Sequence, residues 1–173
     1  HIQSIMGHST FNRIIVWLND LVNKGYVSKE FTRQFGAKPT VYWLATKSRN
    51  VLLNYGDLTS VDLKIIYKEK TRSVNFKETC LIIADISISL VKLTKSAGSK
   101  LHFYTRTDLW GMKGMILPIP DAYFAIEEPN GLTKRYFLDI FSAHDPRMWY
   151  RKRITQYQEY YDDGYWQKST DKT

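Results

Sequence analysis

The chain has 173 residues, of which 43% are hydrophobic and 14% aromatic, so it can build one sizeable core or two small ones and is not mainly disordered. Its formal net charge of +8 is concentrated in residues 1–56, where seven Lys and Arg stand against two Asp and Glu. The single cysteine, Cys80, excludes an internal disulfide, and no run approaches the roughly 20 apolar residues of a membrane span. We therefore expect a soluble, cytoplasmic protein without a membrane partner, a buried Cys80, and an anionic partner for the N-terminal end.

The first strong pattern is an amphipathic helix within residues 9–24. Ser9 or Thr10 can cap its start, and Gly25 ends it near Lys24, because glycine adopts the left-handed backbone at low cost. Residues 2–6 are expected to end a preceding helix. One face carries the apolar residues at three- and four-residue spacing: Phe11, Ile14, Ile15, Leu18, Leu21 and Val22.

Two β-prone runs, 26–31 and 40–45, follow the helix and flank a basic, turn-rich segment. A helix and a basic hairpin predict the DNA-reading half of a winged helix-turn-helix over residues 1–56, in which the helix enters the major groove and the hairpin tip follows a phosphate backbone. Because a helix-turn-helix needs an earlier helix, we expect the chain to lack its first helix. The residues expected to contact double-stranded DNA are Thr10, Asn12, Arg13 and Trp17 at the bases and Arg33, Lys38, Lys47 and Arg49 at the phosphates. The simpler alternative is that these charges are merely solvated.

A second domain is expected over residues 57–168, with Gly56-Asp57 as the boundary and a disordered tail at 169–173. Residues 58–71 are charged and show no clear pattern. Asn130-Gly131 predicts a tight turn between the last two strands, and Pro146 and Gly164 bracket the final helix. The fold class is therefore α+β, with a small α/β second domain. Its elements are helices at 47–55, 71–95 and 146–163 and strands at 100–106, 122–127 and 135–141.

Short motifs in this second domain carry a family resemblance. They are Pro120-Asp121-Ala122-Tyr123-Phe124, then Tyr136-Phe137-Leu138-Asp139-Ile140, then a basic helix with Tyr157, Tyr160 and Tyr161 before Gly164. The chain thereby resembles the replication-relaxation family of plasmid and mobile-element proteins, which join an N-terminal winged helix to such a region. The resemblance implies a role in plasmid replication or in relaxation and mobilisation of DNA.

The same residues resemble, more distantly, the PD-(D/E)xK nuclease fold. There, two carboxylates on adjacent strands hold a divalent metal, and a lysine orients the attacking water. Asp121 and Asp139 match the carboxylates, which would hold Mg²⁺ or Mn²⁺, and Glu78 and Gln156 are further candidates. Phe141 stands where the lysine is needed, and it also departs from the acid usual in the replication-relaxation family. The resemblance thus implies a degenerate nuclease-like domain, without a confident catalytic or metal residue, unless Arg151 or Lys152 substitutes for the lysine.

Simpler roles exist for each of these residues. Asp121 can cap a turn, Asp139 can pair with an arginine, and Gln156 and Tyr160 can pack a helix. Gly111 and Gly114 lack the strand-to-helix context of a phosphate loop and are expected in an ordinary loop. The tryptophans outside the first helix and hairpin are expected in the core or at an interface: Trp110, Trp149 and Trp166.

The leading hypothesis is a double-stranded DNA-binding accessory protein for plasmid replication or conjugative mobilisation, with no cofactor. Winged helices commonly dimerise on palindromic sites, so a homodimer is a further expectation, although no heptad pattern marks a seam. One alternative is a metal-dependent DNA nuclease that uses Asp121 and Asp139. A second is an adaptor that recruits a relaxase or replication protein.

Overall fold

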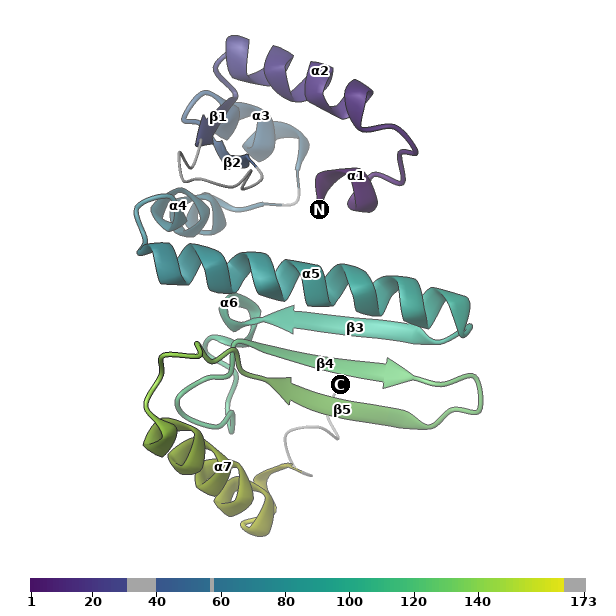
Figure 1. Ribbon diagram of the computed structural model, residues 1–173, viewed down its shortest axis with the longest axis vertical. Helices are drawn as coiled ribbons and strands as arrows, with labels where there is room; N and C mark the ends of the chain where they lie inside the picture. The colour runs from purple at the N-terminus through teal and green to yellow at the C-terminus, as the bar shows by residue number, and fades with distance from the viewer. Residues whose placement is uncertain (31–39, 57, 167–173) are drawn as a thin grey trace. The chain divides into compact units, whose positions relative to one another are not determined.

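The computed structural model describes residues 1–30, 40–56 and 58–166 and divides into two compact units, His1–Glu78 and Thr79–Thr173 (Figure 1). Within the described residues, seven helices and two small antiparallel sheets confirm the mixed α+β class. The boundary expected at Gly56-Asp57 falls inside the first unit. No helix in the described ranges is long and apolar enough to cross a membrane.

The first unit begins with a helix and a hairpin. Gly25, at φ +76°, follows the C-terminal end of the second helix, as predicted. The two strands after it pair antiparallel, with Val27 opposite Leu44 and Glu30 opposite Val41. The elements of this unit are α1 (Ile2–Ile5), α2 (Phe11–Asn23), β1 (Val27–Glu30), β2 (Val41–Leu44), α3 (Ser48–Tyr55) and α4 (Ser60–Glu69). The long helix α5 (Val74–Ser96) starts here and continues into the second unit.

The core of the first unit is small. Ile14 of α2 and Leu63 of α4 are fully buried. The Ser48 hydroxyl lies 2.8 Å from the Tyr67 hydroxyl and donates to the Ala45 carbonyl at 2.7 Å, which joins α3 and α4 to the end of β2. The apolar stripe of α2 is only partly buried. Phe11 and Leu21 are exposed, because the face that meets the rest of the unit is narrower than the sequence pattern.

The second unit is built on a three-stranded antiparallel sheet in the order β3-β4-β5. Its strands are β3 (Lys100–Thr105), β4 (Ala122–Glu127) and β5 (Thr133–Leu138), with α6 (Arg106–Leu109) after β3 and α7 (Arg147–Asp162) after the sheet (Figure 1). The turn predicted between β4 and β5 is confirmed: Gly131 has φ +82°, and the Leu132 amide donates to the Asn130 side chain at 2.9 Å.

One face of this sheet carries the core of the second unit. Leu109, Tyr123 and Ala125 are buried, and Phe137 and Trp166 pack against them. Helix α7 is held to this face because the rings of Tyr157 and Tyr160 lie 5.5 and 5.9 Å from that of Phe137.

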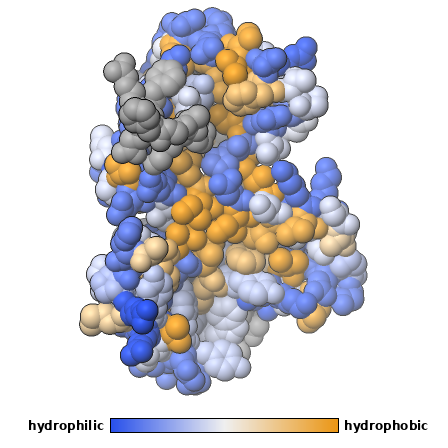
Figure 2. All heavy atoms as spheres, in the orientation of Figure 1, coloured by the Kyte–Doolittle hydropathy of each residue, from blue (hydrophilic) through white to orange (hydrophobic). Residues whose placement is uncertain are grey.

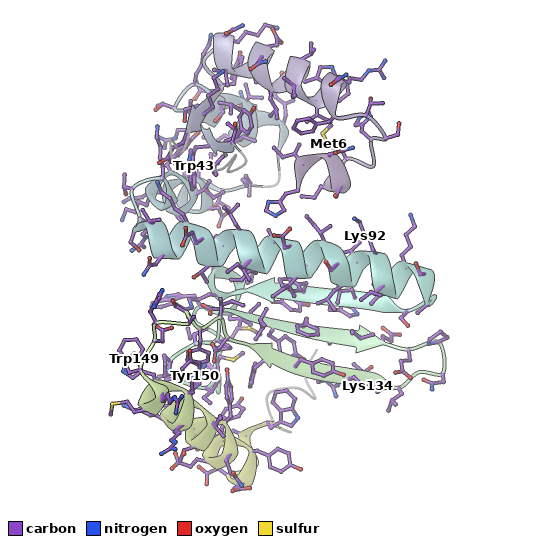
Figure 3. All side chains as sticks on the ribbon, viewed as in Figure 1. Met6, Trp43, Lys92, Lys134, Trp149 and Tyr150 are labelled. Atoms are coloured by element: carbon purple, nitrogen blue, oxygen red, sulfur yellow. The ribbon has the colours of Figure 1, made fainter. Side chains whose placement is uncertain are left out.

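Other side chains also lie at the surface, among them Cys80, which the sequence placed in the interior, and Trp149, which it placed in the core or at an interface. Cys80 is exposed on α5, so the prediction that it is buried is wrong. Trp149, at the start of α7, is also exposed (Figure 3). On the side shown in Figure 2, apolar side chains gather in patches between polar ones. In the first unit, Phe11 and Val16 of α2 are among the exposed apolar residues.

Candidate functional site

The exposed side of α2 is the surface on which base contacts were predicted. Thr10 occupies the N-cap position in an extended conformation without a capping hydrogen bond from its side chain, and Asn12 and Arg13 lie in the first turn, exposed to solvent. No ion pair joins Arg13 to any residue that the structure describes. Trp17, one turn further on, is partly exposed, with its ring edge-on to His8 at 5.0 Å between centroids. These four side chains therefore lie along one solvent-facing stretch of the helix.

The residues predicted to contact phosphates divide into three cases. Arg33 and Lys38 lie outside the described residues. Arg49 is exposed on α3. The Lys47 ammonium donates to the Lys24 carbonyl at 3.0 Å, where it satisfies a carbonyl at the C-terminal end of α2 and complements the helix dipole.

A second set of charges joins the hairpin to the start of α5 within the first unit. The Lys77 ammonium lies 3.1 Å from the Glu30 carboxylate and 5.1 Å from the centre of the Trp43 ring, and the Trp43 indole also donates to Glu30 at 3.1 Å. The hydrogen bond from Lys77, followed by that from Trp43, holds the pKa of Glu30 below its usual value. These contacts hold the C-terminal end of β1 to β2 and to the start of α5.

In the second unit, the register of β4 and β5 brings two predicted acids together. Ala122 pairs with Leu138, so Asp121, one residue before β4, stands opposite Asp139, one residue after β5. The Asp121 amide donates to Asp139 Oδ1 at 3.3 Å, and the Ile140 amide donates to Asp121 Oδ2 at 2.8 Å. The two acids that the nuclease resemblance matched therefore lie next to each other at one end of the β4–β5 pair.

Each aspartate is matched by an arginine. Arg106 lies just after β3, and its Nη2 is 2.7 Å from Asp121 Oδ1, while its amide donates to the Asp121 carbonyl at 3.0 Å. Arg153 reaches from α7, with its Nε 2.5 Å from Asp139 Oδ2. Arg153 is only 7% exposed, so this pair is withdrawn from water, and removal of either charge would leave the other buried without its counter-ion.

Tyr157 completes the cluster around Asp139. Its hydroxyl donates to Asp139 Oδ2 at 2.6 Å and accepts from Arg153 Nη2 at 2.9 Å. Burial, together with the hydrogen bond to Asp139, raises the pKa of Tyr157 above its usual value. The hydroxyl therefore remains a neutral donor to the carboxylate.

The arrangement does not fit the metal that the nuclease resemblance implies. Three of the four carboxylate oxygens of Asp121 and Asp139 accept hydrogen bonds from the protein, and the fourth, Asp121 Oδ1, is in an ion pair with Arg106. Two guanidinium groups would therefore compete with a cation. Across residues 1–30, 40–56 and 58–166, no group of three or more His, Cys, Asp or Glu gathers as metal ligands. Glu78 is exposed on α5, in the first unit, and Gln156 is half-buried on α7.

Phe141, which stands where the nuclease pattern has a lysine, has a packing role in this chain. The Phe141 ring packs on Tyr150, with 4.5 Å between centroids. Arg151 and Lys152, which sequence reasoning offered as substitutes for the lysine, are exposed on α7. The arginine that reaches the aspartates from this helix is instead Arg153, in line with the simpler expectation that Asp139 pairs with an arginine.

Sequence reasoning missed Arg106, Arg153 and Tyr157. Arg153 and Tyr157 are four residues apart, so they share one face of α7, but many polar residues of that helix have the same spacing. What distinguishes them is that they lie next to Asp139 at the end of β5. Sequence alone cannot show this, because it depends on how α7 is rotated about its axis.

The fold and the two surfaces define a mixed α+β protein with a helix-and-hairpin unit and a separate sheet unit that carries a closed cluster of charges. The replication-relaxation family model matches residues 2–173, and the chain belongs to this family, as its motifs indicated. The family indicates a role in replication or relaxation of plasmid and mobile-element DNA. Searches of curated proteins and of solved structures gave no match.

Proposed function

We propose that the chain is a double-stranded DNA-binding accessory factor for plasmid replication or conjugative mobilisation. The observation that carries this proposal is the exposed first turn of α2, where Asn12 and Arg13 face solvent just ahead of the β1–β2 hairpin. A helix followed by a two-stranded hairpin is the arrangement of a winged helix, and the family's role in DNA metabolism agrees with it.

In this proposal, α2 enters the major groove. The planar guanidinium of Arg13 suits the two acceptors of guanine, and the Asn12 amide suits the donor and acceptor of adenine. Thr10 and Trp17 lie at the edges of this contact. Arg49 and the basic segment that contains Arg33 and Lys38 would bind phosphates, which fix the position on the duplex without reading its sequence. Lys47 would act by holding the end of α2.

The second unit serves as a scaffold and not as a nuclease. Asp121 and Asp139 are engaged by Arg106 and Arg153, and Phe141 replaces the lysine that would position water. Keeping these carboxylates in ion pairs leaves no group to activate a nucleophile at the strand ends.

The test uses a duplex enriched from a random library on the full chain. Arg13→Ala should weaken binding to that duplex by about 1–3 kcal/mol and should weaken binding to random duplex much less. Arg151→Ala makes the same charge change at an exposed site of α7 and should alter both affinities little. Fluorescence anisotropy with labelled duplexes measures all of these affinities. If Arg13→Ala loses equal affinity on selected and random DNA, Arg13 is not a sequence reader.

The nuclease alternative is tested separately. Supercoiled plasmid, linear duplex and single strands are incubated with Mg²⁺ or Mn²⁺ and either the intact chain or Asp139→Asn. We expect neither protein to cleave, while the intact chain still shifts duplex DNA in a gel. Cleavage by the intact chain that Asp139→Asn abolishes would establish the nuclease and overturn the scaffold role.

A further inference from the structure

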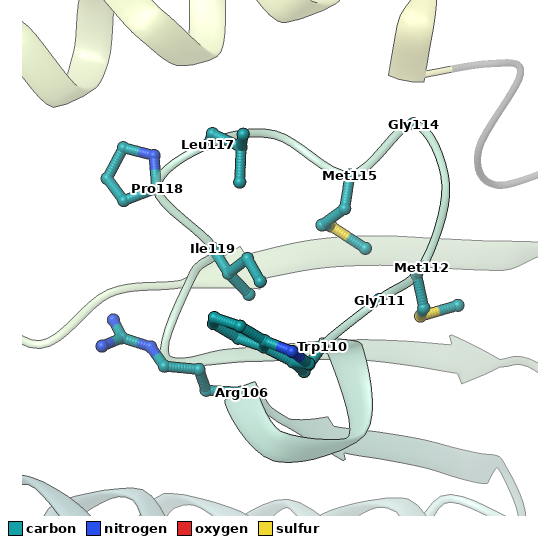
Figure 4. A pocket seen from close by; sticks show the side chains of 9 residues that line it. All are labelled: Arg106, Trp110, Gly111, Met112, Gly114, Met115, Leu117, Pro118 and Ile119. Carbon is teal, nitrogen blue, oxygen red and sulfur yellow. The ribbon is translucent and has the colours of Figure 1, made fainter.

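A pocket of about 640 Å³ opens in the second unit, in the loop between α6 and β4 (Figure 4). In this view Ile119 lies next to the Trp110 ring, Leu117 and Met115 point toward it from the far part of the loop, and Arg106 lies beside it. Apart from Arg106, the lining is apolar or glycine: Trp110, Gly111, Met112, Gly114, Met115, Leu117, Pro118 and Ile119. The volume and the apolar lining with one charged group are typical of sites that take a single bulky group.

The loop is fixed in place, so the pocket is already formed without an occupant. At its two ends, Leu109 and Pro120 are fully buried, and Ile116 is buried between them. In the middle, the Tyr160 hydroxyl of α7 donates to the Gly114 carbonyl at 2.9 Å. The turn at Gly114 requires glycine, because its φ is +81°.

Several large apolar side chains of the same loop are exposed to solvent. Trp110 is 78% exposed and Leu117 is 73% exposed, and Met112 is also exposed. Tryptophan, methionine and arginine are the residues most enriched at the centres of protein interfaces, and methionine adapts its shape to different partners. An exposed apolar patch beside a buried frame marks a contact surface.

The charge at the pocket identifies the partner. Arg106 lines the pocket with about half of its side chain exposed, and only its Nη2 is engaged by Asp121. Lys113 adds a second exposed cation to the same loop. We propose that this pocket binds a bulky apolar side chain of a partner protein, with an aspartate or glutamate next to it that pairs with Arg106.

Nucleic acid fits this pocket less well. A single-stranded site needs several cations along a groove, whereas Arg106 is the one charged residue among those that line this pocket. The proposal goes beyond DNA binding, because the pocket lies in the second unit and the α2 surface in the first.

The first experiment selects peptides from a phage-displayed library on the full chain and measures the enriched peptides by fluorescence polarisation. We expect a bulky apolar residue adjacent to Asp or Glu in the enriched sequences. Trp110→Ala should weaken their binding by about tenfold or more, as for an interface hot spot. Trp149→Ala removes an exposed tryptophan outside the pocket and should leave the affinity unchanged. Circular dichroism confirms that both variants fold.

A matched charge pair then tests the acidic component. Leu117→Glu and Leu117→Lys remove the same apolar contact, but the first should bind the enriched peptide several-fold more weakly than the second at low salt, and the gap should shrink as salt is added. Peptide affinity should be unaffected by Arg13→Ala, and duplex binding by Trp110→Ala, which separates this proposal from DNA binding.

Three results overturn the proposal. The first is no enrichment of an apolar residue beside an acid. The second is equal peptide affinity for the intact chain and Trp110→Ala, or for the two Leu117 variants. The third is displacement of the peptide by oligodeoxythymidine together with Trp110-dependent oligonucleotide binding, which would make a single strand the occupant.

Discussion

The α2 surface and the Asp121–Asp139 cluster each contain an arginine, and the two arginines differ in burial and in their partners. Arg13 stands in water, without an ion pair to any described residue, whereas Arg153 is buried and held by Asp139 and Tyr157. A solvated guanidinium costs the fold nothing and keeps its donors available for an incoming base or phosphate. A buried guanidinium is tolerated only with a counter-charge, and then it determines stability rather than recognition.

The largest effect expected from this contrast is on Arg153. Arg153→Ala leaves the Asp139 carboxylate partly buried without its counter-ion, so the free energy of unfolding should fall by about 3–5 kcal/mol. Arg151→Ala, two residues earlier and exposed on the same helix, should change it by less than about 0.5 kcal/mol. Guanidinium chloride unfolding measures both values. Similar small losses for the two variants would show that the cluster is not a buried ion pair in solution.

Tyr157 allows the hydrogen-bond part of the cluster to be separated from its charge. Tyr157→Phe keeps the ring contact with Phe137 but removes the donor to Asp139, which should cost about 1.5–3 kcal/mol of unfolding free energy. Tyr161→Phe, at an exposed position of α7, is the control and should be close to neutral. A neutral result for Tyr157→Phe in the same unfolding assay would assign the stability of the cluster to the ion pair alone.

Salt should affect the two regions differently. Duplex affinity should fall linearly with the logarithm of salt concentration, and Arg49→Ala should reduce that slope by about one unit if Arg49 contacts a phosphate. The same variant should leave the free energy of unfolding within about 0.5 kcal/mol of the original, because Arg49 is exposed. Duplex titrations of the original chain and of Arg49→Ala at several salt concentrations measure the two slopes. Equal slopes would show that Arg49 does not contact a phosphate.

The smallest effect is expected from an exposed ion pair in the first unit. Because the pKa of Glu30 is lowered from 4.5, its bonds with Lys77 and Trp43 stabilise the fold above pH 4.5, and this contribution is lost as the pH falls through the lowered value. Glu30→Gln should therefore be slightly less stable than the original at neutral pH, with the difference vanishing in acid. Exposed Glu159→Gln is the control, and a difference that persists in acid would contradict the assignment.

Strong periodicity and turn residues were sufficient to predict most of the elements. The helix that ends at Gly25, the strands joined by Asn130-Gly131 and the final helix after Pro146 all appear close to their predicted positions. Helices α4 and α6 were missed because both are short and charged. Yet both begin with the same local signal, a threonine whose amide donates to an aspartate three residues later: Thr59 to Asp62, and Thr105 to Asp108.

The candidate site was predictable only in part. The meeting of Asp121 and Asp139 follows from two strands and a tight turn, which local sequence specifies. Their arginine partners depend on how α7 is rotated and where α6 starts, and these are decided by packing over long sequence separations. The same limit explains why Cys80 was wrongly expected to be buried and why Phe11, on the apolar face of α2, is exposed, since periodicity shows which residues share a face but not how much of that face is covered.

The hydrogen bonds of the Asp121 amide to Asp139 and of the Ile140 amide to Asp121 have a consequence for motion at the end of the sheet. Strand ends usually open and close readily, and their amide hydrogens exchange with solvent within the early phase of an exchange experiment. Here the β4–β5 pair is closed at one end by its turn and at the other by carboxylates that hold the Asp121 and Ile140 amides. These two amides should therefore exchange deuterium as slowly as those in the middle of the strands, and opening should begin elsewhere in the unit.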